Sequence, residues 1–338
     1  MNSSHRSSIL PRSKKQVFLI LPLLVLLVAG LSICLGAEKL NIFQAISDCL
    51  RGEQTTASRI FLYVRLPRTC AGLLAGAALA ASGAIIQGVL SNSLAAPSTI
   101  GVNAGAGLAV AVFCAFAPSA LNWVPVAALV GAFGGVMLVM TLAEHTSASK
   151  ITLVLAGVAV SGIFSAGIDA VVTFVPEALN GYSDFRIGGL SGVSMKQLVP
   201  AWILIVPGLG AALSLHNEMD ILMLGTEQAK SLGLRAGSLR MILLAVAALL
   251  AGSAVSFSGL IGFVGLIVPH MLRQFIGEES GPLVAASALG GAVLLCGCDL
   301  MARLVFAPFE VPVGIVMSLV GGPFFIWLLR KRGGHSHD

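Results

Sequence analysis

Three arginines stand at the ends of apolar segments, where charged side chains are rare. Arg65 and Arg68 bracket an Arg-Leu-Pro-Arg run, and Arg303 lies near the end of a later apolar segment. A guanidinium is a planar fork of donors that can hold both oxygens of one carboxylate. The pattern therefore predicts arginines that bind carboxylates, or alternatively arginines that anchor the chain among lipid headgroups. Arg65 and Arg68 would share one helix face, and Pro67 marks the entrance of a helix.

Two acids and one histidine also lie within apolar sequence. Asp299 precedes Arg303 by four residues, so the two side chains can pair on one helix face. Asp169 has no such neighbour and could line a polar pathway through a membrane. His270 has the chemistry of a proton relay, but a packed and hydrogen-bonded histidine near a membrane face is the interpretation that we favour.

The motifs of soluble catalytic sites are absent from the sequence. It contains no G-x-x-x-x-G-K-[ST] run, so the chain does not bind ATP through a P-loop, and no H-E-x-x-H or G-x-S-x-G run. None of the six cysteines forms a C-x-x-C pair, which favours small buried side chains over redox or metal roles. Pairing of Cys49 with Cys70 is left open. His335 and His337 indicate at most weak metal binding in a disordered tail, so no metal site is predicted.

The elements that position these side chains must be membrane helices. Hydrophobic residues make up 57% of the 338 residues and charged residues only 10%, whereas soluble domains carry about 25% charged residues. The mean hydropathy is +0.95. This composition predicts an all-α polytopic membrane protein and excludes a soluble domain. The net charge of +5 lies mostly at the chain ends, which favours an effect on membrane orientation over nucleic-acid binding.

About ten apolar segments are candidates for transmembrane helices. We expect them at residues 16–36, 66–90, 101–117, 123–143, 151–173, 197–214, 241–257, 262–276, 283–302 and 313–330. Residues 16–332 would form the membrane domain, between a basic tail at 1–15 and a short tail at 333–338. The first segment is too long for the apolar core of a signal peptide, and no clear A-x-A site follows it. Ten spans place both termini on one side, and a modest excess of lysine and arginine there favours the cytoplasm.

Two internal stretches depart from plain apolar helices. Residues 215–240 form the most polar internal segment and lie between two spans. Residues 258–273 combine three glycines and a proline with hydrophobic sequence. That combination predicts a short or broken helix that its neighbours shelter, or else glycines that only let helices approach closely.

Six ordered runs carry a resemblance to a known family. They are RLPR at 65–68, GAALAASGAIIQGVLSNSLAAPSTIGVNAGAG at 76–107, LGTEQAKSLGL at 224–234, GLIGFVGLIVPHMLR at 259–273, DLMAR at 299–303 and EVPVGIVMSLVGGPFFIWLL at 310–329. Together they resemble the FecCD family, the permease subunits of bacterial ABC importers for iron–siderophores, haem and vitamin B12. The resemblance covers residues 60–332 and implies a type II ABC importer permease fold with ten helices per subunit. It also implies two permease subunits, two cytoplasmic ATPases and an external substrate-binding protein.

The resemblance implies roles for single residues on both faces. Arg65, Arg68 and Arg303 match arginines that meet acidic residues of the binding protein, with headgroup anchoring as the alternative. The cytoplasmic segment that resembles the family's coupling element would be two short helices resting in a groove of the ATPase, or else a solvated loop. The residues that we assign to it are Gly225, Glu227, Lys230, Gly233 and Arg235.

The resemblance also implies a cytoplasmic gate. Asn92 and Leu94 would form it together with a second turn, before the fifth span, that contains Ser147 and Ser149. An ordinary capped turn is the alternative. Ser93 departs from the family pattern, which usually has proline there, and this leaves the geometry of the turn open.

The favoured function is the permease subunit of an ATP-driven importer in the bacterial cytoplasmic membrane, with both termini in the cytoplasm. No cofactor or catalysis is expected in this chain, because ATP and Mg would bind the partner ATPase. Iron–siderophore is the first expectation for the cargo, while haem, cobalamin and the identity of the second permease subunit stay open. An ion-coupled secondary transporter is the alternative, but it needs paired ionisable residues at the midplane, and Asp169 is a weak basis for that.

Overall fold

The chain forms a bundle of helices around one buried central helix. The computed structural model describes residues 10–36, 38, 40–145, 150–305, 307 and 309–333. Its α-helices are α1 Leu10–Cys34, α2 Ile42–Leu50, α3 Thr56–Ile60, α4 Leu66–Leu90, α5 Val102–Phe116, α6 Val124–His145, α7 Lys150–Phe174, α8 Ala178–Ile187, α9 Met195–Ser214, α10 His216–Met223, α11 Thr226–Ser231, α12 Ala236–Ser258, α13 Val264–Ile276, α14 Ser280–Val305 and α15 Val313–Gly333. A π-helical turn at Phe61–Arg65 and 3-10 turns at Pro97–Ile100 and Leu121–Trp123 complete the described helical structure.

Each of the ten predicted spans coincides with a helix. Seven described helices are long and apolar enough to cross a membrane, while those at Val102–Phe116, Val264–Ile276 and Val313–Leu328 are apolar but shorter. The prediction of an all-α polytopic membrane protein is confirmed. The first helix starts at Leu10 rather than at residue 16, and Pro11 stands in its first turn, where a missing N–H costs nothing.

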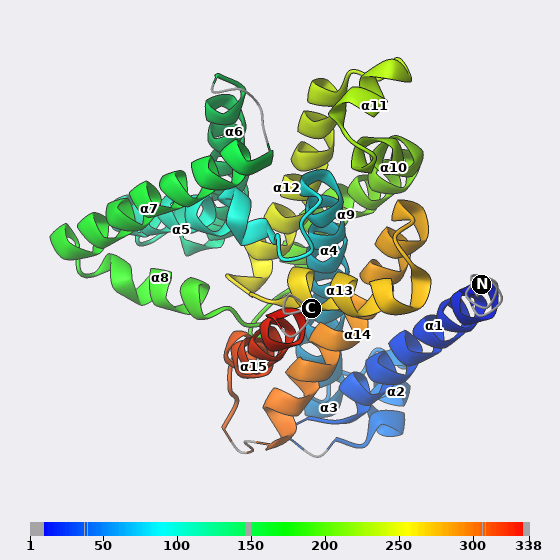
Figure 1. Ribbon diagram of the computed structural model, residues 1–338. Coiled ribbons are helices and arrows are strands. Elements are labelled where there is room, and N and C mark those ends of the chain that lie inside the picture. Colours follow the sequence, from blue (N-terminus) through cyan, green and yellow to red (C-terminus); the bar gives the residue numbers. More distant parts are fainter. Residues whose placement is uncertain are drawn as a thin grey trace.

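Helix α4 is the centre of the bundle, with α12, α13 and α14 packed around it (Figure 1). Glycines allow this packing, because they let two helix backbones touch. A Cβ on Gly76 would collide with the carbonyl of Gly291 in α14, and a Cβ on Gly83 would collide with the carbonyl of Gly265 in α13. These glycines therefore mark close contacts between helix backbones.

The predicted break after Ser258 is present. Helix α12 ends there, Gly259 and Phe263 both have positive φ (69° and 67°), and α13 begins at Val264. Such a break is tolerable at membrane depth only if protein satisfies the backbone. Leu260 N donates to Phe185 O at 2.9 Å, so α8 provides that shelter. Both interpretations of the glycines hold, since Gly265 is also the residue that approaches α4.

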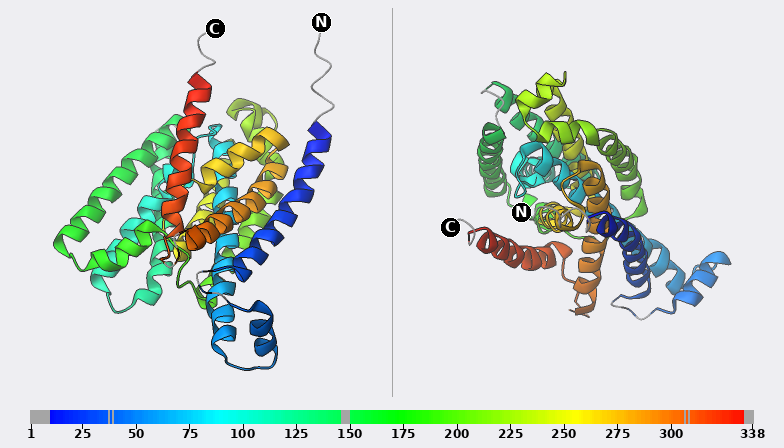
Figure 2. Two further views of the ribbon diagram at one scale, coloured as in Figure 1. Left: turned by 90° about the horizontal axis from the view of Figure 1, so that it is seen from below. Right: turned by 45° about the vertical axis from the view of Figure 1, so that its right-hand side comes forward.

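The ends of the bundle carry different elements. Figure 2 shows that α1 starts, and α15 ends, at the same end of the bundle, while α2 and α3 lie at the opposite end. Helices α10 and α11 belong to the end where α1 starts. From the start of α1 to the end of α15 the chain therefore crosses the bundle an even number of times. This agrees with the ten predicted spans.

Candidate functional site: an arginine network and two polar ends

A buried ion-pair network lies where α1, α4 and α14 meet, at the end of the bundle that holds α2 and α3. Arg68 approaches Asp299 with two nitrogens, Nε at 3.1 Å from both carboxylate oxygens and Nη2 at 3.0 Å from Oδ1. Its Nη1 donates to Glu310 Oε2 at 2.6 Å. Arg303 Nε lies 3.1 Å from Asp299 Oδ2, and Arg303 Nη2 donates to Ser32 Oγ at 2.7 Å. One carboxylate, that of Asp299, therefore holds two guanidiniums.

Arg65 closes the end of α1 instead of joining this network. Its Nη1 donates to the carbonyls of Ile33 and Cys34 at 2.9 and 2.7 Å, and its Nη2 donates to Glu38 O at 2.6 Å. The last carbonyls of a helix have no partner within the helix, and a cation is favourable beside them. Arg65 thus fixes the end of α1 against the entrance of α4.

These contacts correct one part of the sequence analysis. Arg65, Arg68 and Arg303 were expected on the outer face, ready for external carboxylates, but only 3%, 5% and 3% of their surfaces are exposed. The physical reason is that a charge removed from water needs partners, and the chain supplies them internally. The predicted Asp299–Arg303 pair and the helix entrance at Pro67 are confirmed. The docking role of the three arginines stays a prediction.

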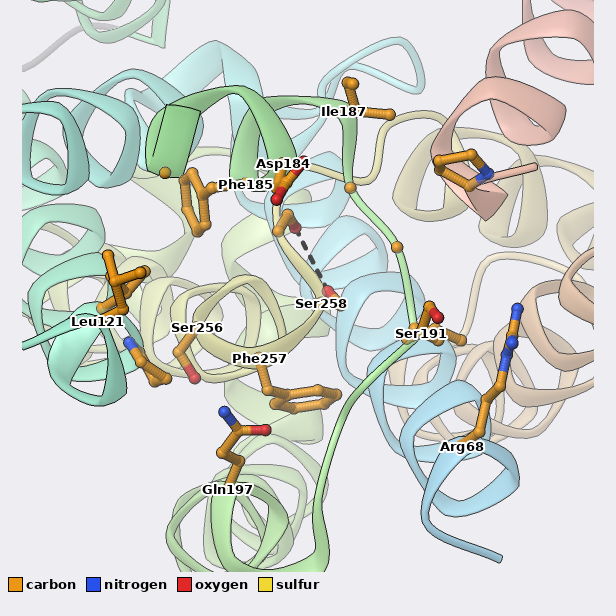
Figure 3. A pocket seen from close by; sticks show the side chains of 18 of the residues that line it. Arg68, Leu121, Asp184, Phe185, Ile187, Ser191, Gln197, Ser256, Phe257 and Ser258 are labelled. Carbon is orange, nitrogen blue, oxygen red and sulfur yellow. Dashed lines mark hydrogen bonds between the residues drawn. The ribbon is translucent and has the colours of Figure 1, made fainter. Parts of the chain in front are cut away.

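A cavity of about 610 Å³ opens beside the network. Figure 3 shows Arg68 on one side of it and Gln197 with Phe257 on the other. Non-helical segments at 188–191 and 310–312 form part of its wall, and Gly314 N donates to Gly188 O at 3.1 Å, which holds them together. Glu310 was not predicted as a site residue. Its place after a break and before Pro312 and α15 was the available signal.

The polar segment at the other end of the bundle folds into short helices. Helices α10 and α11 both lie within the coupling segment predicted at residues 215–240, so the implied pair of short helices is present. Gly225 and Gly233 have φ of 127° and 81°, which few residues other than glycine adopt. Glu227 and Lys230 pair at 3.1 Å with 83% and 61% of their side chains exposed, and Arg235 is also exposed.

Two large apolar side chains accompany these charges. Leu224 and Leu232 flank α11 and are 67% and 62% exposed. The α10–α11 surface, residues 216–235, therefore combines exposed leucines with exposed charges. Exposed apolar groups with a polar rim are typical of a protein interface.

The predicted gate turn at Asn92 is compact. Ser91 adopts a left-handed conformation with φ of 47°, and Asn92 Oδ1 accepts from Leu94 N at 3.0 Å. The asparagine therefore closes its own turn, and the turn forms without the proline of the family pattern. Lys150 Nζ lies 2.5 Å from Ser91 Oγ, which brings the start of α7 next to this turn. Ser147 and Ser149 lie outside the described residues, and the gate role stays a prediction.

Several smaller expectations are also resolved. His270 packs against Phe324 with ring centroids 6.4 Å apart, as expected of a packed histidine. All six cysteines are free, so Cys49 and Cys70 form no disulfide. Within the described ranges, no group of three His, Cys, Asp or Glu residues is placed to hold a metal ion. His335 and His337 lie outside those ranges.

Comparison with known proteins decides among the transporter classes. The model of the FecCD transport family matches residues 23–331. The chain belongs to the FecCD transport family. The permease is 33% identical over 319 residues to the Fe(3+)-citrate import system permease protein YfmD of Bacillus subtilis strain 168, with 94% of this chain and 96% of that protein covered. It is 38% identical over 288 residues to the hemin transport system permease protein HmuU of Yersinia pestis, covering 82% and 85%.

The similarity extends to structure. The permease matches a solved structure described as an inward-facing conformation of a metal-chelate type ABC transporter, with a TM-score of 0.82 and 29% identity. The match covers 94% of this chain and 99% of that one. The protein is therefore a multi-pass permease subunit of an ABC importer.

Proposed function

We propose that the permease forms the pathway by which a metal chelate, delivered by a substrate-binding protein, enters the cell. Its relatives include permeases for Fe(3+)-citrate, hemin and cobalamin, which supports a metal chelate as cargo. ATP would be hydrolysed in separate ATPase subunits in the cytoplasm. A second permease subunit would complete the pathway, in the bacterial inner membrane with both termini cytoplasmic.

One observation carries the proposal. The α10–α11 surface projects from the end of the bundle where α1 starts, with exposed charges and leucines together on two short helices. A soluble partner that docks there would transmit its motion to α12, which begins directly after this segment at Ala236. Alternating access driven from a partner needs such a rigid contact.

The double variant Glu227→Ala/Lys230→Ala tests this coupling. We expect ATPase stimulation to fall by about tenfold, the equivalent of ~1.4 kcal/mol, because the variant removes two exposed charges from the contact. The exposed pair itself adds less than about 1 kcal/mol to stability, so thermal unfolding should not change. The measurement is ATP hydrolysis by the assembled complex in nanodiscs, with Lys196→Ala at the opposite end as the control. Wild-type stimulation in the double variant would contradict the coupling role.

We also propose that the binding protein docks over the arginine network. In the network itself the charges of Arg68 and Arg303 are balanced by those of Asp299 and Glu310. Arg65 beside it donates only to backbone carbonyls and so adds one positive charge to this end of the bundle, and Glu310 is 37% exposed at the edge of the network. Carboxylates of a docking protein would be attracted to this end of the bundle, less strongly as salt screens the field. Glu310→Gln should therefore strengthen binding of the purified binding protein several-fold at low salt. Affinity that responds neither to the variant nor to salt would argue against docking at this network.

The inner gate is proposed at the turn of Asn92 and Leu94, next to the start of α7. Leu94→Ser should raise passive leak of the cargo through the permease in liposomes, because a smaller polar side chain blocks the pathway less completely than leucine does. Unchanged leak, with the protein shown to be inserted, would remove Leu94 from the gate.

A further inference from the structure

The exposed face of α7 changes character along its length. Only three residues of this helix are buried, namely Leu153, Gly157 and Val160. In the half near Lys150 the exposed stripe is large and apolar: Ile151, Leu155 and Val158, at 72%, 62% and 63% exposure. In the other half the same stripe continues with small and polar residues, Gly162, Ser165, Asp169 and Thr173, all of them exposed.

The second half of this stripe does not suit lipid. These residues recur every three or four positions, so they share one helix face. A lipid-facing surface needs apolar side chains, and an aspartate in a membrane helix costs up to about 3 kcal/mol. Such residues normally face a bundle interior or a water-filled cavity. This half of the face therefore adjoins water or protein in the assembled transporter.

A pocket lies on this part of the face. It has a volume of about 490 Å³ between α7 and α8, and its polar lining is Ser165, Asp169, Thr173, Tyr182 and Arg186. Thr173 Oγ1 donates to Asp169 O at 2.7 Å, so that hydroxyl proton is already used. Among the described residues, no ion pair within 4.0 Å joins Asp169 to Arg186. Asp169 and Arg186 thus line the same pocket without forming an ion pair with each other.

Tyr182 provides a third polar group in the pocket that Asp169 and Arg186 line. Burial raises the pKa of its phenol, while Arg186 lowers it and Asp169 raises it. The net rise keeps the phenol protonated at neutral pH, so it can donate as well as accept a hydrogen bond.

We propose that this α7–α8 pocket contacts the cargo in the translocation pathway. Arg186 would take an anionic oxygen of a polar chelate, and Asp169 would accept from a hydroxyl or amine donor on the same molecule. A guanidinium suits carboxylate oxygens, whereas the aspartate repels an anionic group on its own side of the pocket, so a carboxylate chelate would bind with its anionic oxygens toward Arg186. The inference rests on the proposed function, and it adds that the pathway distinguishes cargo by charge pattern.

The first test asks whether the pocket faces water. A thiol is introduced by Ser165→Cys, and by Ile203→Cys as a control, since Ile203 is 66% exposed on α9 at a comparable distance from the same end of the bundle. Charged methanethiosulfonate reagents are added to the permease in nanodiscs, and mass spectrometry identifies each modified residue, so the native cysteines can stay. Modification at residue 165 should be at least tenfold faster than at 203. Equal rates would overturn the proposal.

The second test asks whether the pocket recognises a chelate. Ferric citrate, which carries carboxylates, should slow modification of the Ser165→Cys thiol several-fold, and the cationic chelate ferrioxamine B should slow it less. Adding Arg186→Gln should abolish protection by ferric citrate, measured as the ratio of the modification rates with and without the chelate in that same variant. Glu177→Gln, at the start of α8 and outside the pocket, should leave protection intact. No protection by either chelate, or protection that survives Arg186→Gln, would overturn the inference.

These outcomes are separable from failure of the proposed function. ATP-driven uptake by the wild-type transporter is measured on its own. If uptake is ATP-driven while the pocket is unprotected, the importer stands and only the cargo contact is lost. If no ATP-driven uptake occurs, the proposed function itself fails.

Discussion

Replacing Asp299 by asparagine is expected to destabilise the permease by about 3–5 kcal/mol. The carboxylate of Asp299 faces both Arg68 and Arg303, and all three side chains are 5% exposed or less. The variant keeps the shape of the side chain but removes its charge, which leaves two buried guanidiniums with too little compensation. Thermal unfolding in detergent would show the loss as a clear fall in the unfolding temperature.

Glu310→Gln is the matched control for this prediction. Glu310 contacts the same Arg68 but is 37% exposed, and exposed pairs contribute less than about 1 kcal/mol. Its unfolding temperature should stay close to the wild-type value. If Asp299→Asn unfolds at the wild-type temperature as well, the network does not hold α4 and α14 together.

The second large effect is expected from Gly291→Val in α14. A Cβ at this position would collide with the carbonyl of Gly76 in α4, so the two central helices would have to separate. Overpacking of this kind costs about 1–3 kcal/mol and more when backbone must move. Fewer correctly assembled molecules and a lower unfolding temperature should follow, measured by size-exclusion chromatography and thermal unfolding.

Gly297→Val on the same helix provides the comparison. Gly297 would place its Cβ in open space, so this variant has the same change in helix propensity without the collision. It should assemble and unfold like the wild type, within the small propensity difference of glycine and valine. Equal damage by both variants would show that the loss comes from helix propensity and not from the contact between α4 and α14.

The positions of the membrane spans were predictable because each helix that crosses a membrane is a continuous run of mostly apolar residues. The Asp299–Arg303 pair was predictable for a similar reason, since four residues along one helix fix its geometry. Arg68 differs, because its carboxylates are 231 and 242 positions away in the sequence. No local pattern marks such partners, so the arginines were expected to be exposed when they are buried.

The pocket between α7 and α8 could not be predicted from local sequence patterns either. Asp169 stood out as an acid in apolar sequence, and a pathway role was predicted from that alone. Arg186 lies in a polar connection where charge is unremarkable, and only the fold of α8 against α7 brings it to the same space. The segment at residues 215–240 shows the reverse, because its own polarity was enough to predict a segment outside the apolar spans, and α10 and α11 lie within it.

Energy coupling separates the importer from an ion-coupled transporter most directly. The decisive measurement is uptake into proteoliposomes that contain the permease with its purified ATPase and binding protein. Labelled ferric citrate, ferrioxamine B, haem and cobalamin are offered in turn, with and without ATP and with ionophores that dissipate ion gradients. We expect uptake of at least one chelate to require ATP and the ATPase and to be unaffected by the ionophores. Uptake by the permease without the ATPase, abolished by ionophores, would contradict an ATP-driven importer.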